Sequence, residues 1–478
     1  MDLHAQLSIL QAAAGHPALI ALCTVDLTHH TLPAERRVRL REALLAAAVP
    51  HWCDAPFLAA LLDTSAEEAA GLLGELHVLN NVEAFPARGP DAVNVHDASR
   101  LALREYLRTE HADFWKLYAQ RAREHVASGT AAHLRIEALF HLFAADVDAA
   151  VEECVALDAN LRENPETRAA LSLCLKELAA GSWLSRPALV ETKLLPLWHR
   201  VSRGEASELE AEALEVLGLA ETHAERPRMA IASKLVGVVN QALGRLPQAL
   251  AHFSACAEIF DDLRRHDPDH GVWQRELASA RCRQGEIHAD LGDLEAAEKC
   301  VDDDLRLLQS LTTQSPDMAS WRHALGNAWA IAGDIRLQQG RYDEARSAFS
   351  ESLRLLQALV QEEPHNALRQ RSLAIAHQHM GCVHAAMGAP EPASQDFQKS
   401  LHISQLLVAV DPSCARWQRG LALALHGVGL ILSSKEDQQQ HCRLAIAAMK
   451  RSVAACPRNA GWQQELQNLQ RWQQELEN

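Results

Sequence analysis

The sequence predicts an all-α protein, a solenoid of stacked helix pairs preceded by a small domain of helices with minor β structure. Two observations predict the solenoid. Prolines recur every 48 residues through the C-terminal half, at Pro268, Pro316, Pro364 and Pro412. Small residues recur in the same register, at Gly285, Gly333, Gly381 and Gly429, and at Ala297, Ala345 and Ala393. Constant periods of this length are typical of supersecondary units that stack on their neighbours.

Residues 1–48 are rich in alanine and leucine and predict helices interrupted near Thr28–Pro33. The stretch from Ala34 to Ala48 predicts a short helix with four arginines, Arg36, Arg37, Arg39 and Arg41. A basic run on one small helix is usually a solvated or interdomain face. The alternative is a contact with nucleic acid.

Residues 49–107 predict a compact domain. A short helix at 55–62 precedes a capping box at Thr64-Ser65-Ala66-Glu67, which opens a helix through Leu79. Extended pieces at 82–85 and 92–95 follow, and then a helix from His96-Asp97 to Leu107.

This domain resembles the winged-helix module of signalling ATPases of the NB-ARC and NACHT type. The segments that carry the resemblance are Phe57-Leu58-Ala59-Ala60-Leu61, Leu72-Leu73-Gly74-Glu75-Leu76 and Val95-His96-Asp97. The helix that would read DNA holds Glu67, Glu68 and Glu75 and no lysine or arginine. Because phosphate attraction supplies most of the affinity for DNA, we expect this module to contact protein.

Residues 108–228 predict irregular helix pairs that lead into the regular array. Ala132–Ala145 has an apolar face at i, i+4 spacing and resembles the helical-repeat arms of the same ATPases. The phosphate-binding pattern G-x-x-x-x-G-K-[ST] is absent from the sequence. The resemblance therefore does not extend to an ATPase domain.

Residues 229–478 contain the regular repeats. Their small-residue pattern resembles the tetratricopeptide repeat family, as in Gly333, Gly340, Ala345 and Phe349. The repeat of about 48 residues is longer than the family's 34, which we interpret as both helices being extended by about two turns. The final helix from Trp462 to Asn478 is rich in Gln and Glu and predicts a polar cap.

The resemblance implies a concave surface lined by the first helix of each pair, which would grip a protein or peptide partner. The groove positions of the family, carried over to this sequence, are Lys234, Gln241, Cys282, Glu286, Asn327, Asp334, Gln378 and His426. Their mixed character favours a peptide or helix over a phosphate-rich ligand. The alternative for each residue is packing against the neighbouring turn.

Aromatic residues also recur in the repeats, at Trp273, Trp321, Trp417 and Trp462. We expect them to form the core between repeats. Arginines recur two residues after this position of the repeat, which is Arg369 in one copy. They are Arg275, Arg371 and Arg419, and we expect them to stack on or bracket the tryptophans.

No pattern in the sequence predicts an enzyme, a cofactor or a metal site. His377 and His384 share a helix face, whereas His379 and Cys382 point elsewhere, so we interpret all four as helix residues of a repeat. His270 lacks the local signature of a cysteine protease, and Asp302-Asp303-Asp304 is interpreted as a solvated helix face.

The composition predicts a cytoplasmic protein. Its formal charge of −16 disfavours generic binding to nucleic acid or anionic membranes. Its eleven cysteines form no C-x-x-C pair, which is typical of reduced thiols, and the Met-Asp-Leu-His start lacks the basic region of a secretory signal.

These observations predict a non-enzymatic interaction scaffold or regulatory adaptor subunit. The family resemblance implies a bacterial signalling or antiviral-defence setting, with a sensor or docking role toward an effector such as a protease. The alternative is a DNA-binding transcription regulator that uses the winged helix and carries the repeats as a sensor arm. The partner, the trigger and the oligomeric state are not determined by the sequence.

Overall fold

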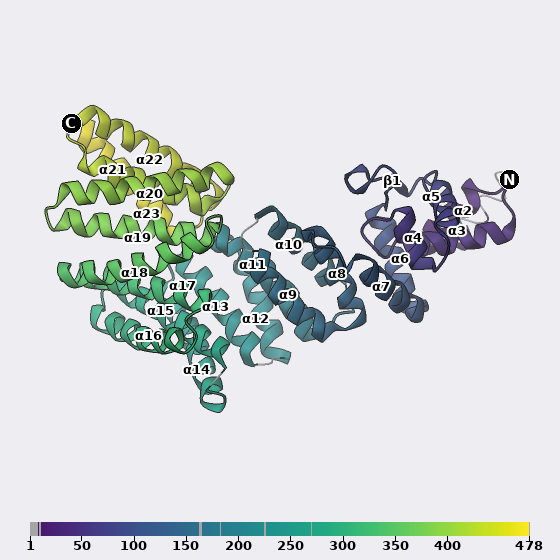
Figure 1. Ribbon diagram of the computed structural model, residues 1–478, viewed down its shortest axis with the longest axis horizontal. Helices are drawn as coiled ribbons and strands as arrows, with labels where there is room; N and C mark the ends of the chain where they lie inside the picture. Colours follow the sequence, from purple (N-terminus) through teal and green to yellow (C-terminus); the bar gives the residue numbers. More distant parts are fainter. Residues whose placement is uncertain are drawn as a thin grey trace. The chain divides into compact units, whose positions relative to one another are not determined.

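The computed structural model describes residues 8, 11–161, 165–181, 183–223, 226–268 and 270–477. The chain forms two compact units, Met1–Leu161 with Ala180–Ala188, and Arg162–Ala179 with Leu189–Asn478. The protein is all-α, and its second unit is a tetratricopeptide-like solenoid (Figure 1). Within the described ranges, no helix combines the length and apolarity that a membrane crossing requires.

The N-terminal part of the first unit packs helices around a small hairpin. The elements are α2 (Pro17–Thr28), α3 (Ala34–Ala47), α4 (Ala55–Leu62), α5 (Ala66–Leu76), β1 (Val82–Ala84), η1 (Pro86–Arg88), β2 (Val93–Val95) and α6 (Asp97–Glu110). The strands are antiparallel, with Val82 opposite Val95. A bridge from Cys53 to Val93 adds a third short segment to this sheet.

Side-chain caps fix where the small helices begin. Asp54 accepts a hydrogen bond from the Phe57 N–H at 2.8 Å and opens α4. Ser65 accepts from the Glu68 N–H at 3.2 Å, so α5 begins one residue after the start that the sequence pattern predicted. These elements match the predicted order of helices and strands, and the winged-helix interpretation itself stays a prediction.

The arginines of α3 all pair with acids of the first unit. Arg36 binds Glu68 at 2.8 Å and Glu75 at 3.0 Å, both on α5. Arg37 and Arg41 lie against Asp26. Arg39 pairs with Glu42 at 2.6 Å. The basic run is therefore neutralised within its own unit, and phosphate would have to compete with these carboxylates.

Three further helices complete most of the first unit, α7 (Ala112–Val126), α8 (Ala132–Ala145) and α9 (Val147–Leu161). The guanidinium of Arg104, on α6, is buried and donates to the carbonyls of Ala48 at 2.8 Å and Val49 at 2.6 Å. These bonds satisfy the end of α3, whose last carbonyls lack partners within the helix.

The second unit continues as an array of helices. They are α10 (Pro165–Ala180), α11 (Arg186–Arg203), η2 (Glu205–Glu208), α12 (Glu210–His223), α13 (Arg226–Ala242), α14 (Leu246–His266), α15 (Gly271–Asp290), α16 (Leu294–Gln314), α17 (Ala319–Gln338), α18 (Tyr342–Glu362), α19 (Ala367–Ala386), α20 (Pro390–Val410), α21 (Ala415–Ile431), α22 (Lys435–Ala455) and α23 (Ala460–Glu477). The first helices α15, α17, α19 and α21 begin 48 residues apart.

Glycines let the two helices of a pair approach each other closely. A Cβ atom added at Gly333 would lie 2.5 Å from the ring of Phe349, and one added at Gly381 would lie 2.6 Å from Phe397. Each phenylalanine ring therefore occupies the space that the missing side chain leaves open. This contact gives a physical reason for the glycine–phenylalanine register of the sequence.

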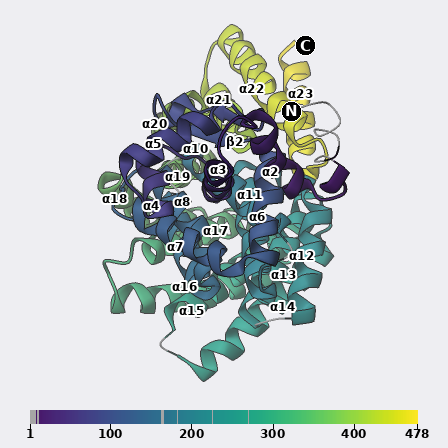
Figure 2. The ribbon, with the colours of Figure 1, turned by 90° about the vertical axis from the view of Figure 1, so that its right-hand side faces the viewer.

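The array curves toward its first helices. Successive first helices pack directly on each other, as α15 on α17, α17 on α19 and α19 on α21. Each second helix contacts the first helix of its own pair and the first helix of the next pair. The face formed by α13, α15, α17, α19 and α21 is called the concave surface below. Figure 2 shows α12 to α23 following one another around a turn.

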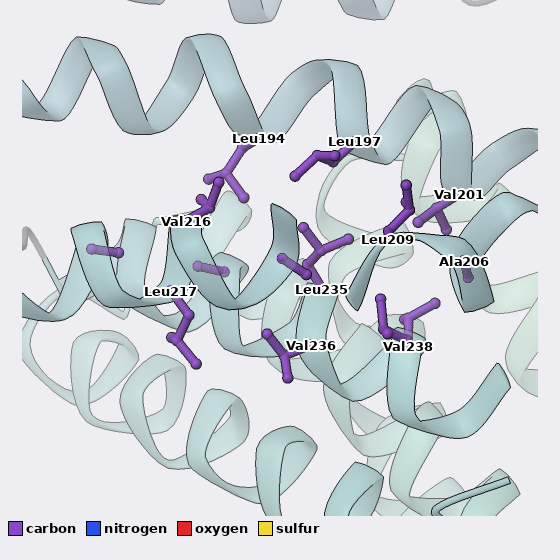
Figure 3. Close-up of a cluster of buried hydrophobic side chains, with 14 of the residues drawn as sticks. Leu194, Leu197, Val201, Ala206, Leu209, Val216, Leu217, Leu235, Val236 and Val238 are labelled. Carbon is purple, nitrogen blue, oxygen red and sulfur yellow. The ribbon is translucent and has the colours of Figure 1, made fainter. Parts of the chain in front are cut away.

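An apolar cluster starts the array where α11, α12 and α13 meet (Figure 3). Leu194 and Leu197 point from α11 toward Val216 and Leu235 of the next two helices. These side chains are less than one-tenth exposed. Burial of a leucine contributes about 2 kcal/mol, so the cluster anchors the first pair of the turn.

The two ends of the turn meet. Arg203, at the end of α11, forms an ion pair with Asp411 and donates to Ser413 Oγ at 2.9 Å. Arg416 Nη2 donates to the Val201 carbonyl at 2.8 Å. A Cβ atom added at Gly204 would lie 2.5 Å from the ring of Trp462, so this seam is tightly packed. The array is therefore closed on itself.

Candidate partner-binding surface

Lys234 lies at the start of the concave surface and has partners within the chain. It forms an ion pair with Glu276, and its ammonium lies 5.3 Å from the centre of the Trp198 ring. Burial opposes ionisation of Glu276, but the charges of Lys234 and Arg275 lower the pKa of this carboxyl to about 2. Lys234 therefore links α13 to α15.

Cys282 points toward the second helix of its own pair. Its thiol donates to the Asp304 carboxylate, with Sγ and Oδ2 2.8 Å apart. Asp304 is fully buried, so the interpretation of Asp302-Asp303-Asp304 as a solvated face is wrong for its third residue. Burial raises the pKa of Asp304 to about 7, although its contact with Cys282 and the charge of Arg281 oppose this shift.

Glu286 and Asp334 give the concave surface two acids with partial partners. Glu286 pairs with Arg283 at 2.7 Å, one turn earlier on α15. Asp334 Oδ1 lies 3.3 Å from His379 Nδ1 of the next first helix. Burial raises the pKa of Asp334, the charge of His379 lowers it, and that of Glu286 raises it again.

Gln378 and His426 bridge neighbouring elements. Gln378 donates from Nε2 to the Leu423 carbonyl at 3.2 Å, which ties α19 to α21, and its Oε1 is buried without a partner among the described residues. His426 meets the Trp472 ring of α23 edge-on, with centroids 4.8 Å apart. Burial lowers the pKa of His426, so its neutral ring packs under the last helix.

Gln241 and Asn327, the remaining predicted groove residues, are both half-buried on first helices. Part of each residue is therefore exposed to solvent, Gln241 on α13 and Asn327 on α17. Six of the eight predicted positions thus have named side-chain partners within the chain, and the binding role of all eight stays a prediction.

The histidine run of α19 is divided between two acids. His377 Nδ1 and His384 Nδ1 lie 2.8 and 3.2 Å from the two carboxylate oxygens of Asp396 on α20. His379 turns to Asp334 instead. Across the described ranges, no three His, Cys, Asp or Glu side chains gather in a group that could hold a metal ion.

Sequence reasoning missed a basic group on the concave surface. It comprises Arg283 of α15, Arg371 of α19, and Arg416 and Arg419 of α21. The recurrence of arginine at positions 275, 371 and 419 is the signal in the sequence, although the prediction relates it to the tryptophans. The observed partners differ, because Arg275 pairs with Glu276 at 2.9 Å and Arg419 with Glu465 at 2.5 Å.

Three of the four recurring tryptophans are less buried than expected. Trp273, Trp321 and Trp417 are half-buried, whereas Trp462 is 8% exposed. A Cβ atom added at Gly271 would lie 2.5 Å from the Trp321 ring, so this indole packs on the preceding repeat.

Residues 326–355 match the family model of the tetratricopeptide repeat. This match covers most of α17 and most of α18, where Gly333 faces Phe349. A comparison with curated proteins finds no match to the chain.

Several solved structures are similar to the chain. A signal transduction ATPase with numerous domains and a tetratricopeptide repeat sensor, from Pyrococcus horikoshii, is 13% identical, with 94% of this chain and 65% of that one covered and a TM-score of 0.45. A Rap protein complexed with competence and sporulation factor is 11% identical, with 78% and 96% covered and a TM-score of 0.46. BtubC from P. vanneervenii is 16% identical, with 58% and 92% covered and a TM-score of 0.35.

Proposed function

We propose that the chain is a non-enzymatic scaffold or regulatory adaptor whose concave surface holds a segment of a protein partner. The observation that carries this proposal is the closed turn of the second unit, with its first helices packed on each other and its ends joined at Arg203 and Asp411. A surface fixed in this way is organised before binding, which lowers the conformational entropy that association costs.

The chemistry of the concave surface suits a peptide or helix. Half-buried amides at Gln241 and Asn327 offer hydrogen bonds, and arginines and acids alternate with apolar positions. Extended peptides and helices are recognised by such combinations of polar contacts and small apolar pockets. The setting that we propose is a bacterial signalling or defence system in which the partner is an effector, such as a protease, or a trigger.

The experiment is affinity capture with the full chain in the source cells, followed by mass spectrometry. Asn327→Trp places a large ring on the concave surface, and we expect it to release the captured partner. Ser350→Trp is the matched control, because Ser350 is exposed on the second helix α18. A partner retained equally by both variants would place binding elsewhere and contradict the proposal.

A further inference from the structure

The basic group on the concave surface contains Arg371, whose charge no described residue balances. Arg371 is half-buried on α19 and, within the described residues, makes no ion pair or hydrogen bond. Arg416 donates to one backbone carbonyl, and its buried Nε has no partner in the part of the chain that the structure describes. Unpaired guanidinium groups in a confined place are costly, because the charge is neither fully hydrated nor balanced.

Arg371 lies near the start of α19, and Arg416 and Arg419 lie near the start of α21, which packs directly on α19. Arg283 belongs to α15, which is separated from α21 by the pairs of α17 and α19. Its charge nevertheless acts on both Arg371 and Arg416. In an array that curves toward its first helices, side chains from non-adjacent pairs can meet only on the inner side.

The charges of the group reinforce each other. Burial and the positive charges of Arg416 and Arg419 lower the pKa of Arg371 well below its usual range. Burial and the charges of Arg283 and Arg419 lower the pKa of Arg416 to about 10. Both shifts have the sign expected when cations crowd together without enough anions.

The acids of the same surface pair with only two of the four arginines in this group. Glu465 is held by Arg419, and Glu286 is held by Arg283. Asp334 faces His379. The positive charge left over lies at the α19 and α21 end, in a chain whose formal net charge is −16. This excess of positive charge favours an anion at this end of the concave surface.

We propose that the partner segment is acidic and that one of its carboxylates sits on the guanidinium groups of Arg371 and Arg416. This proposal rests on the proposed function and specifies the chemistry of its partner. Guanidinium groups bind carboxylates through paired hydrogen bonds, and here the carboxylate would complete donors that the fold leaves unused. A peptide source fits better than a free anion, because the apolar and amide positions of the same surface would hold the flanking residues.

The test is fluorescence anisotropy of the full chain with a labelled peptide of alternating glutamate and alanine. A lysine–alanine peptide is the charge control. We expect only the acidic peptide to bind. The substitution Arg371→Glu should lower the affinity for this peptide by roughly tenfold or more. Arg354→Glu is the matched control, since Arg354 lies on α18 with a side chain 66% exposed, and it should leave the affinity unchanged.

Two outcomes would overturn the proposal. One is an acidic peptide that binds Arg371→Glu as tightly as the original chain. The other is complete displacement of the peptide by inorganic phosphate, but not by potassium chloride of equal ionic strength, which would assign the arginines to a small free anion. If Asn327→Trp releases the captured partner while Arg371→Glu has no effect, the scaffold function stands and only this inference fails.

A second measurement needs no ligand. Arg371→Met removes one of the crowded charges and keeps much of the apolar stem. We expect its melting temperature to rise by roughly 2 °C, because the remaining arginines repel each other less. A lower melting temperature would mean that Arg371 supports the fold, which contradicts its assignment to a ligand.

Discussion

At the scale of single residues, the first unit contains a buried carboxylate whose partners are both histidines. Glu137 on α8 is 3% exposed. It accepts hydrogen bonds from the His51 backbone N–H at 2.9 Å and from His141 Nε2 at 3.0 Å, and His51 Nδ1 lies 2.7 Å from its other oxygen. Burial opposes its ionisation, but the charge of His51 and these hydrogen bonds hold the pKa of Glu137 well below its usual value.

Glu137→Gln should destabilise the protein by roughly 2–4 kcal/mol, because it leaves buried donors with a weaker acceptor. A lowered carboxyl pKa contributes stability that is present above the unfolded pKa and lost as pH falls through the folded pKa. The difference between the original chain and Glu137→Gln should therefore be largest near neutral pH and shrink under acid. Urea titrations at several pH values measure it. The exposed Glu110→Gln serves as control, and equal losses from both changes would refute the prediction.

Asp304 gives the opposite dependence on pH. Its pKa is raised from 3.8 to about 7, so folding favours the protonated carboxyl. The stability that this group contributes is fully present below its unfolded pKa and is lost as pH rises through about 7. Asp304→Asn keeps a neutral polar group of similar size and removes this loss.

We expect Asp304→Asn to stabilise the chain by roughly 2 kcal/mol more at pH 8 than at pH 5.5, because the loss runs from the unfolded pKa of 3.8 up to about 7. Thermal melts at the two pH values measure this. Asp303→Asn is the control on the same helix, because the Asp303 side chain is 40% exposed and pairs with Arg306. A pH-independent effect of Asp304→Asn would show that the buried carboxyl does not titrate in this range.

At the scale of elements, the contact between a glycine of one helix and a ring of the next sets the spacing of each pair. Gly333→Ala would place a methyl group 2.5 Å from the Phe349 ring, so helices α17 and α18 must move apart or the ring must rotate. Overpacking of this kind costs about 1–3 kcal/mol. Denaturant unfolding of the full chain measures the loss.

Gly218→Ala is the matched control for that prediction. Gly218 also lies inside a helix, α12, but a Cβ atom added there meets nothing within 4 Å. Alanine favours helix over glycine by about 1 kcal/mol, so this change should stabilise the chain. If both changes stabilise, close packing does not explain the recurring glycine.

At the scale of the whole molecule, the repeats were the part that the sequence could predict. Their register places Gly333 against Phe349 and starts each first helix at a constant interval, and both are local consequences of residue size. The small hairpin was also predictable, since Val82–Ala84 and Val93–Val95 flank a turn with proline and glycine. Contacts that depend on the curvature of the array were not.

The missed features join residues far apart in the chain. Arg203 and Asp411 pair across 208 positions, and Arg416 reaches the Val201 carbonyl across 215. No periodic pattern marks such contacts, because they depend on how many pairs complete one turn. The basic group was missed for the same reason. Each arginine alone is an ordinary helix residue, and only the closed turn brings Arg283 near Arg371.

The last prediction concerns the seam that closes the turn. Gly204 has φ of 99°, and a side chain there would meet both the Trp462 ring at 2.5 Å and Arg416 at 3.2 Å. Gly204→Val should therefore open the seam, destabilise the second unit by roughly 2–4 kcal/mol and speed hydrogen exchange around residues 201–210 and 456–462.

Gly340→Val separates the seam from backbone strain. Gly340 has φ of 74°, so valine is strained there as well, but a Cβ atom added there meets nothing within 4 Å. We expect backbone strain alone to destabilise Gly340→Val, by roughly 1–3 kcal/mol, and hydrogen exchange at the seam to stay unchanged. Because an open seam frees the α21 end of the concave surface, Gly204→Val should also weaken binding of the acidic peptide, whereas Gly340→Val should not. Equal exchange and equal peptide affinity in the two variants would mean that closure does not organise the binding surface.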